Sequence, residues 1–253
     1  MSTRCYRPIA LCALLFLAAA TPVFAGARAV IGDSWTGPPR KLQAIIDATY
    51  GPGRIDVQTD YIGARPGDPD RVIWQSALWP VMQIREIAGA ELRSEFGWYI
   101  EAGGQHRPAI DGRDDGAVFK NERAGTVTTL LQLRTGGRSV GFYLHTPDAG
   151  SGQGPRTFFT NRGFNDVGPG GTGALHEPTE GGDIQALVFD VSLWTRPNTW
   201  LVCFESRDSG AMPGACCGTT DNDYADYVFE VRADAATPNL APSFGSLKAL
   251  YRD

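Results

Sequence analysis

The chain has 253 residues and a net charge of −5 at neutral pH, and 42% of its residues are hydrophobic. A chain of this length can bury a sizeable core. Its acidic balance argues against nucleic acid and anionic membranes as partners, because both require basic patches.

The first 25 residues have the pattern of a secretory signal peptide. Arg4 and Arg7 precede an apolar run from Ile9 to Ala20, and small residues lead to Ala25. This run is 12 residues long, whereas a membrane-spanning helix needs roughly 20. We therefore predict cleavage after Ala25 and a secreted protein, either extracellular or periplasmic, without a membrane span. Removal of the leader leaves a net charge of −7.

One amphipathic helix is predicted over residues 40–50. Leu42, Ile45 and Ile46 have helical spacing, Pro39 precedes them, and Gly51-Pro52-Gly53 follows the pattern. A short terminal helix is also predicted over residues 243–251, where three apolar residues align along one side.

Short runs rich in β-branched and aromatic residues fill most of the remaining chain, separated by glycine and proline. Their number and spacing favour an all-β fold, an antiparallel β-sandwich of jelly-roll character, over a parallel α/β sheet. We assign one domain to residues 26–232 and a linker and tail to residues 233–253. The predicted strands are residues 27–31, 55–61, 71–74, 81–88, 96–100, 116–120, 126–134, 139–145, 157–160, 184–191, 200–205 and 226–231.

Enzymatic motifs are weak. Val30-Ile31-Gly32-Asp33-Ser34 resembles the first block of the GDSL hydrolases, where the serine is the nucleophile, but that family also uses an Asp-x-x-His motif. His106, His145 and His176 are not preceded by such an aspartate and lack zinc-type spacing. The acidic pairs Asp114-Asp115 and Glu177/Glu180 are explained as well by solvated loops as by glycosidase chemistry. Most of the tryptophans are expected in the core rather than on sugars. We expect a non-enzymatic protein.

An acidic, cysteine-containing stretch from Thr199 to Val231 concentrates the remaining chemistry. A strand apolar on both faces (200–204) is followed by a loop and an alternating strand (226–231). Five carboxylates in this region predict a calcium site, because Ca²⁺ takes six to eight oxygen ligands in flexible geometry. A solvated acidic turn is the alternative. The candidate metal ligands are Glu205, Asp208, Asp221, Asp223 and Asp226.

Three cysteines follow the leader, and in an exported protein they favour a disulfide. The simplest pairing joins Cys203 to Cys216 or Cys217, which closes a loop of about 14 residues and adds about 3 kcal/mol. A bridge between the adjacent Cys216 and Cys217 is an alternative that requires strained geometry.

The segment Phe204-Glu205, followed after a loop by Asp221-Asn222-Asp223-Tyr224-Ala225-Asp226-Tyr227, resembles the C-terminal signature of domain of unknown function 4114. A weaker likeness extends through residues 96–99 and 141–147. The resemblance implies a bacterial exported protein related to those with a PEP-CTERM sorting anchor. Ser206 and Ala225 depart from the family's Asp and Asn, and the anchor is not found, so we expect release rather than tethering.

Two functions follow as expectations. The first is a secreted, non-enzymatic binding or structural module with a calcium-stabilised acidic loop, whose partner is an extracellular glycan or surface protein. The second is a carbohydrate-directed protein, either a lectin or a glycosidase that uses the loop carboxylates.

Overall fold

The computed structural model describes residues 29, 31, 42–65, 74–75, 79–89, 94–101, 108–120, 125–133, 138–147, 155–165, 184–206 and 223–233. The elements in chain order are α1 (Leu42–Tyr50), β1 (Trp74–Gln75), β2 (Trp79–Gly89), β3 (Glu95–Ile100), β4 (Asp115–Lys120), β5 (Val127–Leu133), β6 (Ser139–Thr146), β7 (Arg156–Phe159), the 3₁₀ helix η1 (Arg162–Phe164), β8 (Ala186–Asp190), β9 (Thr199–Phe204) and β10 (Tyr227–Ala233).

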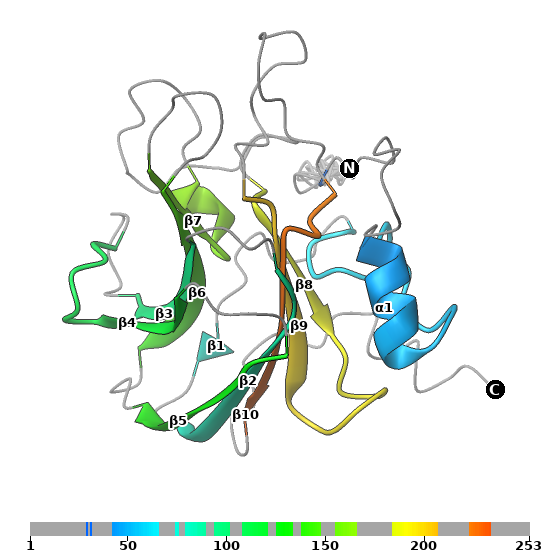
Figure 1. Ribbon diagram of the computed structural model, residues 1–253, viewed down its shortest axis with the longest axis horizontal. Coiled ribbons are helices and arrows are strands. Elements are labelled where there is room, and N and C mark those ends of the chain that lie inside the picture. Colours follow the sequence, from blue (N-terminus) through cyan, green and yellow to red (C-terminus); the bar gives the residue numbers. More distant parts are fainter. Residues whose placement is uncertain are drawn as a thin grey trace, which may run out of the picture.

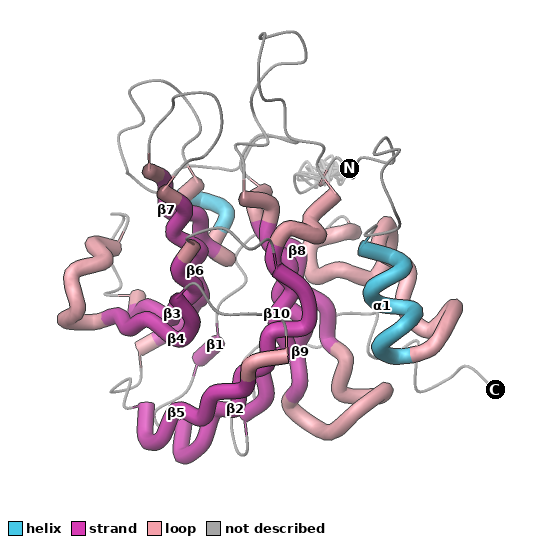
Figure 2. The backbone as a smooth tube through the Cα atoms, viewed as in Figure 1, coloured by secondary structure: helices cyan, strands magenta, loops and turns pink. Residues whose placement is uncertain are grey.

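Two antiparallel sheets of five strands face each other (Figure 1), so the predicted β-sandwich is confirmed. The first sheet has the order β1-β6-β3-β4, and β7 also pairs with β6. The second sheet has the order β5-β2-β10-β9-β8. The last described strand, β10, therefore lies in the middle of its sheet, between β2 and β9. Figure 2 shows these strands as two layers with α1 beyond the second sheet.

The core between the sheets is rich in aromatic side chains. Phe96 on β3 stacks on Phe229 of β10 with 3.8 Å between ring centroids. Trp74 contacts Phe142 of its own sheet and Trp200 of the opposite sheet edge-on. Both tryptophans are fully buried, as expected for most of the tryptophans, whereas Trp194 in the β8–β9 loop is 37% exposed. These rings join the two layers of the sandwich.

A second core lies on the outer face of the second sheet, where α1 packs. Leu42, Ile46 and Tyr50 of α1 are buried there together with Leu201 and Cys203 of β9. Every residue of β9 is buried, because alternate side chains enter the two cores. This explains the double-sided apolar pattern that the sequence shows in this strand. The helix predicted over residues 40–50 is confirmed as α1.

Residues 55–61 form turns instead of the predicted strand. The side chain of Gln43 on α1 supplies the hydrogen bonds that a neighbouring strand would provide: its Nε2 donates to Ile55 O at 2.8 Å, and its Oε1 accepts from Val57 N at 3.1 Å. Asp56 Oδ1 accepts from Gln58 N at 2.8 Å. The apolar residues of this segment are still buried, in the core beneath α1.

The outer face of the first sheet pairs large rings with glycines. In the register of β3 and β6, Gly97 lies opposite Tyr143 and Tyr99 opposite Gly141. Each tyrosine ring occupies the space where a Cβ of the opposite glycine would lie. Tyr99 and Tyr143 are completely buried, in a third cluster with Phe159 and Phe164. Residues 243–251, predicted as a terminal helix, lie outside the described residues, as do residues 1–25, predicted as a signal peptide, and most of residues 27–31.

Candidate functional site

Three of the five predicted metal ligands lie at the junction where β9 ends and β10 begins. Phe204 pairs with Tyr227 in the register of these strands, so Glu205 and Asp226 flank the last pair. Glu205 is completely buried and Asp223 is 7% exposed. We call Glu205, Ser206, Asp223 and Asp226 the acidic corner. Asp208 and Asp221 lie outside the described residues.

Asp226 connects the two sides of the acidic corner. One oxygen, Oδ2, accepts hydrogen bonds from the backbone N–H of Ser206 at 2.8 Å and from its hydroxyl at 2.6 Å. Ser206 occupies the position where the sequence resemblance implies an aspartate. Two carboxylates at this point would repel each other, whereas a hydroxyl donor stabilises the Asp226 carboxylate directly. The departure at Ser206 therefore gives Asp226 a partner within the protein.

Asp223 and Tyr224 form the turn that leads into β10. Asp223 Oδ1 accepts from Ala225 N at 2.8 Å, which is an Asx turn. Tyr224 has a φ of +52°, a conformation that non-glycine residues rarely adopt. Its hydroxyl donates to Ile184 O at 2.7 Å and its ring is completely buried. The turn thereby fixes Asp223 next to the end of β9.

A buried arginine belongs to the electrostatic environment of the acidic corner. Burial raises the pKa of Tyr224, the charge of Glu205 raises it further, and the charge of Arg162 lowers it. Glu205 and Arg162 therefore both act on the same hydroxyl group. Arg162, on η1, is 1% exposed, and a buried carboxylate needs positive charge nearby to remain ionised. Arg162 is not recognisable from the sequence, because an isolated Arg-Gly-Phe far upstream has no distinctive pattern.

The guanidinium of Arg162 lies in a cage of backbone and aromatic groups. Its Nη2 donates to Ile62 O at 3.1 Å, and its Cζ lies 5.8 Å from the ring centroid of Tyr61. Gly63 has a φ of +93°, and a Cβ there would come within 2.6 Å of Nη2. Only glycine satisfies both the backbone conformation and the space that the guanidinium needs.

The acidic corner has the residue types of a calcium site but, among the residues described, not the arrangement of one. Within the described residues, no group of three or more His, Cys, Asp or Glu side chains is arranged to hold a metal ion. Glu205, Asp223 and Asp226 carry the hard oxygen atoms that suit Ca²⁺ chemically, but their carboxylates do not form such a group. A complete calcium site at this position would need further oxygen ligands, for which Asp208 and Asp221 are the candidates in the sequence.

The predicted disulfide from Cys203 to Cys216 or Cys217 is not formed. Cys203 is a free, completely buried thiol. Its side chain lies on the face of β9 that packs beneath α1, and burial raises its pKa. Cys203 thus acts as a small apolar residue of the core. Cys216 and Cys217, and with them the alternative bridge between neighbours, lie outside the described residues.

The other candidates from the sequence have structural partners or lie outside the described residues. Asp114 forms a bidentate ion pair with Arg138, in which Nη1 and Nη2 each donate to one carboxylate oxygen at 2.8 Å. These hydrogen bonds lower the pKa of Asp114. Asp115 accepts two backbone N–H groups at 2.9 Å, and His145 contacts the Thr157 hydroxyl at 2.9 Å. The remaining candidates, His106, His176, Glu177, Glu180 and the Gly-Asp-Ser segment, are not described.

The comparisons with known proteins gave no family: no family model matches the chain, and no curated protein or solved structure matches it either. The resemblance to domain of unknown function 4114 therefore stays a prediction. No helix in the described part of the chain is long and apolar enough to cross a membrane.

Proposed function

We propose that this protein is a secreted, non-enzymatic binding or structural module, in which a calcium ion at the acidic corner stabilises the junction of β9 and β10. The observation that supports calcium is the burial of Glu205 and Asp223 at the junction of β9 and β10, where Asp226 also lies. Removing two carboxylates from water is costly unless positive charge compensates them. The positive charge of Arg162 acts on Tyr224, between Asp223 and Asp226 in the chain, and a divalent cation would compensate the carboxylates directly.

The non-enzymatic part of the proposal rests on the groups that the described structure places together. Asp226 and Asp223 accept hydrogen bonds from the backbone, and the Tyr224 hydroxyl donates to a backbone carbonyl. These interactions hold chain segments in place. They favour a role in stability over a role in bond-breaking chemistry.

Calcium dependence is tested by thermal unfolding of the secreted chain in 10 mM calcium and in chelator. Extracellular calcium modules have dissociation constants of about 0.1 to 1 mM. If the protein binds calcium with such a constant, calcium at about 10 mM stabilises the fold by roughly 1.4 to 2.7 kcal/mol. This corresponds to an increase in Tm of about 3 to 10 °C. Asp223→Asn is expected to reduce this shift. Asp114→Asn, which changes an exposed carboxylate of the other sheet, is expected to keep it.

Equal Tm values in calcium and chelator, together with no heat of calcium binding in calorimetry, would reject the metal. A shift that Asp223→Asn leaves unchanged would place the ion elsewhere in the molecule.

A carbohydrate-directed function is the second candidate. The observation that favours it is an arginine-lined groove on the outer face of the second sheet. The described residues of this groove contain one carboxylate, Glu230, whereas most glycoside hydrolases use two. This favours binding of a saccharide over its hydrolysis.

A further inference from the structure

The outer face of the second sheet has a groove beside the region that α1 covers. Its volume is about 320 Å³, at the lower end of the range for small-molecule sites. The floor consists of two cross-strand rows that follow the register of β5, β2, β10 and β9. The rows are Val127–Arg85–Glu230 and Gln83–Arg232–Thr199. Thr195 and Arg196 of the β8–β9 loop complete the lining.

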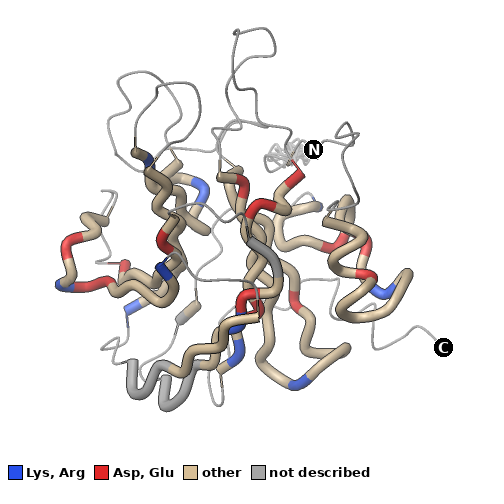
Figure 3. Tube along the Cα trace, in the orientation of Figure 1, with Lys and Arg blue, Asp and Glu red and all other residues tan. Residues whose placement is uncertain are grey.

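The charge of the groove is opposite to that of the chain. Its lining contains three guanidinium groups, those of Arg85, Arg196 and Arg232, and the single carboxylate of Glu230. The local charge is therefore +2 in a chain whose net charge is −5. Figure 3 shows basic and acidic segments together on β2 and β10. Such a concave basic surface attracts anions, and guanidinium groups bind carboxylate or sulfate oxygens in pairs.

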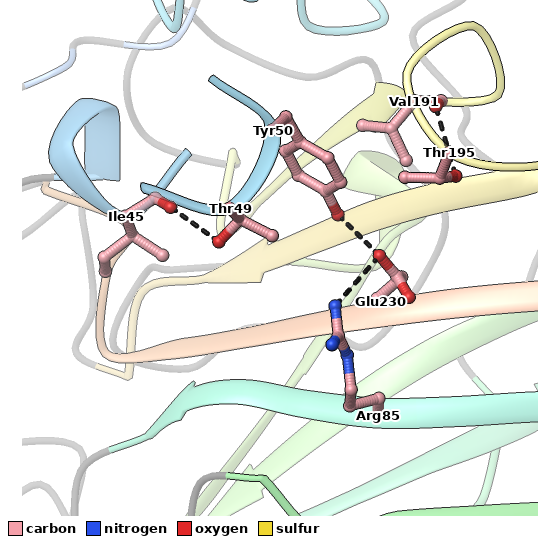
Figure 4. A network of polar contacts seen from close by, with 7 residues as sticks. All are labelled: Ile45, Thr49, Tyr50, Arg85, Val191, Thr195 and Glu230. Atoms are coloured by element: carbon pink, nitrogen blue, oxygen red, sulfur yellow. Dashed lines mark hydrogen bonds and ion pairs between the residues drawn. The ribbon is translucent and has the colours of Figure 1, made fainter. Parts of the chain in front are cut away.

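One arginine of the groove is held in position before any ligand arrives. Glu230 Oε2 accepts from the Tyr50 hydroxyl at 2.9 Å and from Arg85 Nη2 at 3.2 Å (Figure 4). The tyrosine belongs to α1, so the helix fixes the carboxylate and the carboxylate fixes the arginine. Preorganisation of this kind lowers the entropy cost of binding.

The lining of the groove also contains neutral polar groups. Thr199 Oγ1 and Arg85 Nε are buried beneath the floor, and neither has a hydrogen-bond partner among the described residues. The exposed amide of Gln83 adds neutral donors and an acceptor, and the Thr195 hydroxyl, which donates to Val191 O at 3.4 Å, adds an acceptor. Neutral polar groups next to arginines suit a ligand that has both hydroxyl groups and an acidic group. An exposed indole, Trp194, belongs to the same loop as Thr195 and Arg196.

We propose that this groove binds an acidic saccharide, a sugar with carboxylate or sulfate groups. The proposal rests on the proposed role as a secreted binding module and names its ligand class. Nucleic acid fits less well, because its affinity comes from many phosphate contacts and the groove has a local charge of only +2. Acidic peptides share the anionic group but lack the dense hydroxyl groups that Gln83 and Thr195 are suited to bind.

The test is calorimetric titration of the secreted chain with four probes: an oligogalacturonate, a dextran sulfate oligosaccharide, a neutral dextran oligosaccharide and a poly-glutamate peptide. We expect binding of the oligogalacturonate or the dextran sulfate, which separates carboxylate from sulfate recognition. We expect none with neutral dextran. Added salt should weaken the binding. Arg196→Ala and Arg232→Ala should each weaken it by about tenfold or more.

Arg113→Ala is the matched control. The Arg113 side chain is 88% exposed and lies just before β4 of the first sheet, away from the groove. Circular dichroism and Tm verify that each variant is folded. The proposal is overturned if neither acidic saccharide binds, if neutral dextran or poly-glutamate binds equally well, or if Arg113→Ala weakens binding as much as Arg196→Ala.

Saccharide titration and Tm measurement, each in calcium and in chelator, separate the calcium proposal from the groove proposal. A calcium-dependent Tm without saccharide binding rejects the groove and keeps the metal. Saccharide binding that is identical in calcium and chelator, with no shift in Tm, keeps the groove and rejects the metal.

Discussion

Asp226 connects the end of β9 to the start of β10 through a single oxygen atom. Its Oδ2 is the acceptor for both the N–H and the hydroxyl of Ser206, which is 5% exposed. A buried N–H that loses its acceptor costs more free energy than a hydrogen bond contributes when both partners are present. The two residues of this contact are therefore not equivalent in their effect on stability.

Asp226→Ala is expected to lower the free energy of unfolding by about 1 to 3 kcal/mol, because Ser206 N is left without an acceptor. Ser206→Ala removes only the hydroxyl bond and should cost about 1 kcal/mol. Urea denaturation in chelator measures both values without a contribution from metal. Equal losses in the two variants would contradict this assignment.

Cys203 is a free thiol buried in the core beneath α1. Since thiolate is the reactive form and burial raises the pKa of this thiol, Cys203 should resist alkylation in the folded protein. It should react quickly in denaturant. Peptide mass spectrometry after a short pulse of reagent measures this, and recovery of Cys203 in a disulfide-linked peptide would show that the thiol is not free.

At the scale of elements, β3 and β6 approach each other through complementary rings and glycines. Gly97 faces Tyr143 and Gly141 faces Tyr99 in the register, and Gly116 of β4 faces Trp98. Cross-strand aromatic rings that cover glycines help to fix the register of a sheet. The glycines in residues 96–99 and 141–143 are therefore sites of close packing rather than turns.

Gly141→Ala is expected to destabilise the fold by about 1 to 3 kcal/mol, because the new methyl group overlaps the fully buried Tyr99 ring. Gly116→Ala is the graded comparison. Its Cβ meets the Trp98 ring at 2.9 Å, and Trp98 is only partly buried and has space to move. Thermal unfolding should rank Gly116→Ala as the milder change. The reverse order would contradict this packing.

Local patterns in the sequence predicted most elements but not their arrangement. The alternation in residues 81–88 and the double-sided apolar run in 200–204 identified β2 and β9. Both patterns involve only residues next to one another in the chain, so they can be read from the sequence. The failure at residues 55–61 had a distant cause, since Gln43 supplies the partners of Ile55 and Val57. The effect of Arg162 on Tyr224 and the pairing of Arg85 with Glu230 likewise join positions far apart in the chain.

At the scale of the whole molecule, buried tyrosines connect its layers. Tyr50 joins α1 to β10, Tyr143 donates to Glu95 at 2.8 Å within the first sheet, and Tyr224 joins the acidic corner to Ile184. Tyr99 is buried in the outer cluster. Burial is the largest cause that raises the pKa of each of these four side chains. The folded protein therefore binds their protons more tightly than the unfolded chain does.

This linkage predicts alkaline unfolding. A tyrosine with a raised pKa in the folded state contributes stability that is fully present below its unfolded pKa of about 10 and is lost as the pH rises above it. Four such groups give a slope of up to about 5 kcal/mol per pH unit. Near-ultraviolet absorbance should report cooperative tyrosinate formation together with loss of circular dichroism. Tyrosinate formation in a protein that remains folded would contradict the prediction.

The central position of β10 has a consequence for how the chain acquires its fold. β10 pairs with β2, whose partner residues lie roughly 140 positions earlier, and with β9. Until residues 227–233 have been synthesised, β2 and β9 lack the strand between them, and both present open edges that invite pairing with other chains. A fold that depends on such distant pairing forms slowly. The second sheet therefore closes only after residues 227–233 are available, and holdase chaperones that cover these edges during synthesis would reduce pairing with other chains.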